Sequence, residues 1–73
     1  MMLKYPVAVE RSEDGSWSAY TLSPTVITGL GDTRELALAD LESAAKFWVS
    51  YMKETGQELP SVDVEVTSIE VAA

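Results

Sequence analysis

The sequence predicts a single α+β domain over residues 1–73, with the element order β-β-β-α-β. Three observations predict it: an early stretch in which apolar and polar residues alternate, a long helical apolar stripe in the middle, and a second alternating stretch near the end. The length is that of one domain, and 47% of the residues are apolar, which is enough for a core.

Residues 3–10 form the first expected strand, because apolar side chains alternate there with others. One side of this strand carries Leu3, Tyr5, Val7 and Val9, and the other carries Lys4, Pro6, Ala8 and Glu10. Since proline has no backbone N–H to donate, we expect Pro6 near the start of the strand or at an unpaired edge.

Two further strands complete an expected antiparallel meander. A turn at residues 12–15, ending in Gly15, leads into a strand over 16–22 that places Trp17 and Tyr20 on opposite faces. Ser23 and Pro24 end that strand, and the β-branched residues of 26–30 predict a short third one.

One long helix is expected over residues 33–55, which contain neither glycine nor proline. Asp32 and Thr33 are alternative N-caps, and with Asp32 as the cap, Glu35 completes a capping box. The apolar stripe consists of Ala37, Leu38, Leu41, Ala44, Ala45, Trp48, Val49 and Met52. Gly56 stands where a left-handed C-cap is expected.

A fourth strand is expected where Val62, Val64 and Val66 alternate with polar residues. The helix would carry this strand back to lie parallel to its neighbour in the sheet. A single helix covers only one face of a sheet, so the other face and an edge remain open to another molecule. We therefore expect a homodimer or a higher homo-oligomer.

The composition excludes several classes of function. Cysteine and histidine are both absent, which removes disulfides, zinc clusters, cysteine nucleophiles and histidine-based acid–base catalysis. Twelve acidic and five basic residues give a net charge of −7, which opposes direct nucleic-acid binding and favours a basic protein partner. No segment predicts a membrane span or a signal peptide, and the lack of cysteine fits a cytoplasmic protein.

Three short motifs, in this order and spacing, resemble the HicB family of antitoxins, the partners of HicA ribonuclease toxins. They are Lys4-Tyr5-Pro6-Val7, Glu13-Asp14-Gly15-Ser16-Trp17, and Gly31-Asp32-Thr33 followed by Glu35, Ala37 and Leu38. The resemblance covers about residues 3–66. It implies a truncated ribonuclease H-like fold without retained catalysis, no cofactor, and steric inhibition of a basic HicA-like toxin.

Two departures from the family pattern bear on this expectation. The family's Asp-Leu-Pro-Gly loop is replaced by Thr21-Leu22-Ser23-Pro24-Thr25, and the second glutamate of the helix start is Leu36. We also expect no C-terminal DNA-binding domain, because the chain ends at Ala73 just after the fourth expected strand. A stand-alone homo-oligomeric domain without toxin pairing is therefore the alternative function.

Candidate partner-binding residues are acidic or aromatic, with one arginine: Glu10, Arg11, Glu13, Asp14, Trp17 and Tyr51. The hairpin residues among them suit an acidic lip for a basic partner. A metal-dependent nuclease would instead need Glu10 together with Asp63 or Glu65. We interpret these acids as the solvated sides of strands and expect no enzyme activity and no metal. Gly29 and Gly31 are likewise expected to serve the turn and cap between strand and helix, and not to form a phosphate-binding loop.

Overall fold

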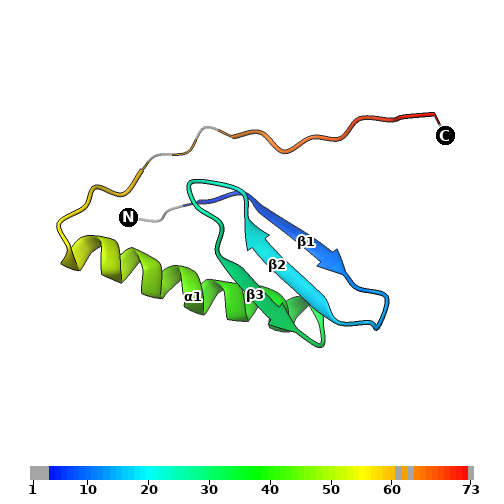
Figure 1. Ribbon diagram of the computed structural model, residues 1–73, viewed down its shortest axis with the longest axis horizontal. Coiled ribbons are helices and arrows are strands. Elements are labelled where there is room, and N and C mark those ends of the chain that lie inside the picture. Colours follow the sequence, from blue (N-terminus) through cyan, green and yellow to red (C-terminus); the bar gives the residue numbers. More distant parts are fainter. Residues whose placement is uncertain (1–3, 61, 63, 73) are drawn as a thin grey trace.

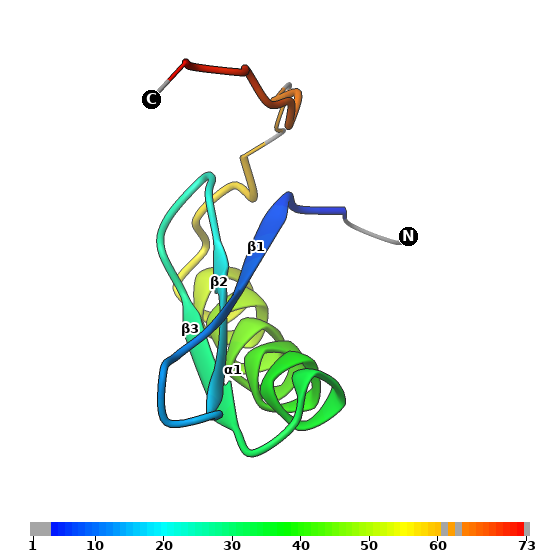
Figure 2. The same cartoon turned by 90° about the vertical axis from the view of Figure 1, so that its right-hand side faces the viewer.

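The computed structural model describes residues 4–60, 62 and 64–72. The described residues form three strands and a helix, in the order β1 (Val7–Arg11), β2 (Trp17–Thr21), β3 (Thr28–Gly31) and α1 (Arg34–Glu54). The strands make an antiparallel sheet in the order β1-β2-β3, and α1 packs on the β2 and β3 part of one face (Figures 1 and 2). The predicted α+β class, the meander and the helix on one sheet face are confirmed.

The register of β1 on β2 sorts the side chains onto two faces. Val9 lies opposite Ala19, and both belong to the core that faces α1. Glu10 and Tyr20 lie on the outer face, where their side chains are hydrogen bonded, so Trp17 and Tyr20 do point to opposite faces. β1 begins at Val7 rather than at residue 3, because Pro6 contributes only its carbonyl, which accepts from the N–H of Leu22 at 2.9 Å.

β3 starts two residues later than the expected position 26, because a buried threonine holds the preceding loop. The Thr21 hydroxyl accepts from the N–H of Ile27 at 2.8 Å and donates to the carbonyl of Thr25 at 2.5 Å. These bonds occupy the carbonyl of Thr25 and the N–H of Ile27, so these two groups do not pair with a neighbouring strand. Val26, on the loop, is left exposed.

Both ends of α1 follow local rules. Thr33 is the N-cap, and its hydroxyl accepts from the N–H of Leu36 at 3.1 Å. This selects Thr33 over Asp32, and the capping box with Glu35 does not form, because Leu36 then occupies the third helical position. After the helix, Gly56 adopts a positive φ of 71°, as expected of a left-handed C-cap.

Two glycines set how closely α1 approaches the sheet. A Cβ on Gly29 would collide with the backbone N of Leu41 and lie 2.5 Å from the carbonyl oxygen of Ala37. A Cβ on Gly31 would lie 2.6 Å from the backbone N of Ala37. The pair therefore provides a close helix–strand contact, not the turn geometry expected from the sequence.

The core beneath this contact is small. Among the described residues only three apolar side chains are buried: Ala19, Ala37 and Leu41. Half-buried Val7, Val9, Trp17, Ile27 and Leu38 surround them. The helical stripe is thus confirmed in position, but most of it is only partly covered by this chain.

The segment after the helix leaves the body of the domain. Residues 64–72, here called the C-terminal arm, are extended and exposed and lie apart from the sheet in both views (Figures 1 and 2). The expected fourth strand is not confirmed, since the described part of it forms no strand and residues 61 and 63 lie outside the described residues. The radius of gyration is 14.3 Å, compared with about 11 Å for a compact chain of this length.

Candidate functional site

The β1–β2 hairpin presents the acidic residues that the sequence singled out. Its turn is closed by bonds from the N–H of Ser12 to the carbonyl of Ser16 and from the N–H of Gly15 to the carbonyl of Ser12, at 2.8 and 2.9 Å. Gly15 takes a φ of 89°, which favours glycine. Glu13 and Asp14 are held at the exposed tip of this turn.

Asp14 also stabilises the turn. One carboxylate oxygen accepts from the hydroxyl of Ser16 at 2.7 Å and from its backbone N–H at 3.0 Å. These two hydrogen bonds, the one from the hydroxyl first, hold the pKa of Asp14 below the usual value for an aspartate. The carboxylate therefore stays charged at neutral pH and keeps free lone pairs for a cationic group.

Glu10 extends the acidic surface onto the outer face of the sheet. Its carboxylate accepts from the hydroxyl of Tyr20, the residue diagonal to it on β2, at 2.8 Å. This hydrogen bond, together with the negative charge of Glu10, raises the pKa of Tyr20 above the usual tyrosine value. The outer face near the hairpin thus combines a fixed carboxylate with a phenol that remains protonated.

The structure brings together four of the six candidate residues. Glu10, Arg11, Glu13 and Asp14 lie within one hairpin and are all exposed. Trp17 is next to them, opposite Arg11, but its ring is half-buried and packs against the core. Trp17 thus contributes mainly to the interior.

Tyr51 belongs to a different part of the surface. It lies 17 residues beyond Arg34, which corresponds to about 25 Å along the helix axis. Because the hairpin tip and the start of α1 are at the same end of the sheet, this distance separates Tyr51 from the acidic lip (Figure 1). Tyr51 is 53% exposed, so its ring is available to a partner on that part of the surface.

Phe47 is an exposed aromatic residue that the helical stripe did not identify. It lies on α1 one turn before Tyr51 and is 78% exposed. Helical geometry places Phe47 on the side of α1 away from the middle of the apolar stripe, and this position was the available signal. Phe47 and Tyr51 together form an apolar surface on α1 that the rest of the described chain leaves exposed.

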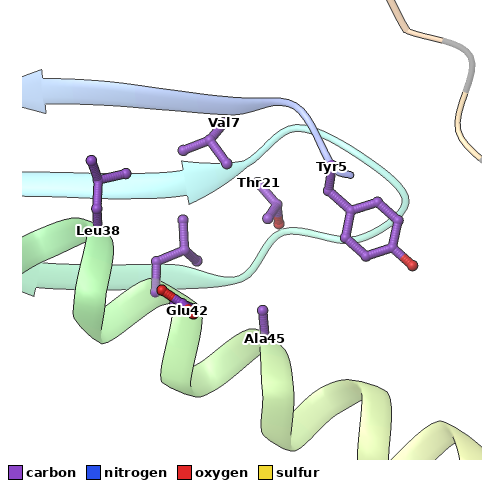
Figure 3. Close-up of a pocket in the computed structure, with 7 residues that line it drawn as sticks. Tyr5, Val7, Thr21, Leu38, Glu42 and Ala45 are labelled. Atoms are coloured by element: carbon purple, nitrogen blue, oxygen red, sulfur yellow. The ribbon is translucent and has the colours of Figure 1, made fainter. Parts of the chain in front are cut away.

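A cavity of about 280 Å³ lies between the start of the sheet and α1 (Figure 3). The sheet side contributes Tyr5, Val7 and Thr21, and the helix contributes Leu38, Leu41, Glu42 and Ala45. Tyr5 packs edge-on against Trp48, with ring centres 6.0 Å apart. Its hydroxyl oxygen is buried and has no hydrogen-bond partner among the described residues. The alternation in the sequence put Tyr5 and Val7 on the same side of the strand but did not predict the space beside them.

The two edges of the sheet differ. On β3 the N–H of Leu30 points outward and is bonded to a carboxylate oxygen of Asp40 at 2.9 Å. On β1 the outward groups are those of Val7, Val9 and Arg11, because the bonds from Leu22 to Pro6 and from Ser12 to Ser16 set the alternation. β1 has no second neighbour in the described sheet. In the described sheet the edge of β1 is therefore open along its length, whereas Asp40 occupies one N–H of the β3 edge.

The acids considered for a nuclease site are not assembled. In the part of the chain that the structure describes, no group of three potential ligands could hold a metal ion. Glu10 is occupied by Tyr20, Glu65 is on the exposed arm, and Asp63 lies outside the described residues. Likewise, no helix in the described ranges is both long enough and apolar enough to cross a membrane.

Comparison with protein-family models, with curated proteins and with solved structures gives no match for this chain. The surfaces just described, rather than a relative, are therefore the basis for a proposal about function.

Proposed function

We propose that the domain is a HicB-like antitoxin module that binds a small basic HicA-type ribonuclease toxin and inhibits it sterically. The observation that carries the proposal is the exposed acidic hairpin on a chain of net charge −7. Such a surface attracts a basic protein and fixes its orientation. Bound there, the domain would cover the toxin's RNA-binding surface in the cytoplasm.

The finer fold belongs to the same proposal. In a HicB-like, truncated ribonuclease H-like domain, a fourth strand after the helix extends the sheet. The element order of the first three strands and the helix supports this, as does the alternation of Val62, Val64 and Val66. The changed loop over residues 22–25 leaves Leu22 exposed, so the toxin contact would differ there from the family pattern.

Inhibition of RNA cleavage tests the proposal. A small basic HicA-type ribonuclease is purified, and its cleavage of RNA is measured with increasing amounts of the domain. We expect stoichiometric inhibition. Exchanging the two hairpin glutamates in the double variant Glu10→Lys/Glu13→Lys should weaken binding about tenfold, because two favourable charge contacts become repulsive.

The matched control changes the net charge of the domain by the same amount, but at residues away from the hairpin. Glu54→Lys/Glu58→Lys alters exposed acids at the far end of α1 and beyond it, away from the hairpin. This control should inhibit as the natural sequence does. Cleavage that continues at a large molar excess of the unmodified domain would overturn the proposal.

A stand-alone homo-oligomeric domain without toxin pairing is the second candidate. The small core and the open edge of β1 favour self-association, since both leave apolar or hydrogen-bonding groups unused. Under either function we propose a homodimer. An isolated gene with no basic neighbour would favour this second candidate over the first.

A further inference from the structure

The arm and the open edge of β1 complement each other. β1 offers the N–H and C=O groups of Val7, Val9 and Arg11 along its outer side. The arm has nine extended residues, about 30 Å, which is longer than the five residues of β1 need. Its valines at 64 and 66 alternate with Glu65 and Thr67, the pattern of a strand with one apolar side.

The cavity beside β1 has room for the side chains that such a strand would bring. α1 packs on β2 and β3, and the inner side of Val7 therefore borders open space above Leu38 and Ala45 (Figure 3). A valine from an added strand would fill part of this space. The buried hydroxyl of Tyr5 lacks a partner among the described residues, and a neighbouring strand would bring carbonyl groups toward it.

Charge favours the same pairing. Two of the chain's five basic residues are at the ends of β1: Lys4 lies three residues before it and Arg11 is its last residue, next to Glu10. The C-terminal part after residue 62 carries Asp63, Glu65 and Glu70 and no basic residue. Lys4 and Arg11 therefore offer the acids of the arm two cationic partners, while Glu10 is held by Tyr20 on the outer face.

The arm does not use its own β1. Its large apolar residues, Val64, Val66, Ile69 and Val71, are between 46% and 84% exposed. The connection over residues 55–60 carries it off the body of the domain, and the chain measures 47 Å along its longest axis. An exposed apolar arm that projects from a domain with an incomplete core is the geometry of an exchanged element.

We propose that the arm adds as a strand to the open edge of β1 in a second copy of this chain, and that the second copy returns its arm in the same way. The arm's valines then enter the cavity of the partner copy. The two-fold exchange buries both arms and leaves no open β1 edge. This assigns an interface to the dimer proposed above and is independent of toxin binding.

Nuclear Overhauser contacts in a mixed sample test the exchange without altering the sequence. Isotope-labelled and unlabelled chains are unfolded together, refolded and examined with filters that select contacts between the two kinds of chain. We expect contacts between Val7 or Val9 of one chain and Val64 or Val66 of the other. If such contacts are found only within one chain, or not at all, the exchange is wrong, even if light scattering still shows a dimer.

A pair of variants gives a second measurement. Val64→Asp/Val66→Asp places charges on the apolar side of the arm and should convert the dimer to a monomer in light scattering. Thr67→Asp, on the alternate side, should leave the dimer intact and serves as the control. A Val64→Asp/Val66→Asp protein that remains a dimer would overturn the exchange, and a natural sequence that is monomeric throughout would overturn both the dimer and the exchange.

Discussion

At the residue scale, a few side chains have roles that only three-dimensional structure reveals. Asp14 and Gly15 were predictable as turn formers, because their preferences are local. Gly29 and Gly31 were not, since the need for a missing Cβ arises from the helix that crosses them. Trp17 and Tyr51 were both candidates for binding a partner, and the structure separates them by packing Trp17 inward.

The hydrogen bonds of Asp14 predict how the stability of the hairpin turn depends on pH. Its lowered pKa means that the turn contributes stability above the usual pKa of an aspartate and loses it as the pH falls through the pKa of the folded state. In an NMR titration the carboxyl carbon of Asp14 should titrate below that of a peptide aspartate. Ser16→Ala should raise this pKa toward the usual value, because one of the two hydrogen bonds is lost.

The contradicting result is an Asp14 titration that matches the unfolded peptide in the natural sequence. It would mean that the turn does not hold the serine against the carboxylate in solution.

Gly29→Ala provides a second prediction at this scale. Its new Cβ would force the α1 backbone at Ala37 and Leu41 to move, which should cost about 2 kcal/mol. For a domain of this size, the melting temperature should fall by roughly 10 °C, measured by circular dichroism. Thr28→Ala, a neighbouring exposed substitution on β3, should change it far less. Equal melting temperatures for the two variants would contradict the close helix–strand contact.

At the scale of the element, the strands and helix were predictable in type and order. Alternation indicated the first strand, a turn signal ending in Gly15 preceded the second, β-branched residues indicated the third, and the stripe from Ala37 to Met52 indicated the helix. Boundaries moved where specific bonds intervened, at Pro6 before β1 and at Thr21 before β3. The choice between Asp32 and Thr33 needed the structure, because both residue types make good caps.

The N-cap at Thr33 predicts how substitutions at the start of α1 change the free energy of unfolding. Thr33→Ala removes the hydroxyl that accepts from the N–H of Leu36 and should lower the unfolding free energy by about 1 kcal/mol. Asp32→Ala should cost less, because Asp32 is not the cap. Urea unfolding of both variants measures the difference. A larger loss for Asp32→Ala would show that α1 begins one residue earlier in solution.

At the scale of the whole molecule, the sequence predicted a sheet with one helix and an uncovered remainder. It could not predict where the last valines lie, since pairing between distant strands depends on contacts that local patterns do not encode. The arm and the cavity beside Val7 were therefore found only in the structure, which also shows that β1 forms an edge of the sheet, as the sequence led us to expect of one strand.

At the scale of the whole molecule we predict that the chain forms a dimer. Light scattering across micromolar concentrations should give twice the 7.9 kDa mass of one chain, because burying two arms adds apolar contacts that the small core lacks. A mass of one chain at every concentration would refute the dimer.

The outer edge of β1 is, as we propose, a binding site for another polypeptide strand. Amide hydrogen exchange of the full chain at Val7, Val9 and Arg11 tests it most directly, with Glu13 at the exposed turn as the unprotected reference. If another strand pairs with this edge, these three amides should exchange about tenfold more slowly than the amide of Glu13, and Val64→Asp/Val66→Asp should remove the protection. Exchange at Val7, Val9 and Arg11 as fast as at Glu13 in the natural sequence would contradict it.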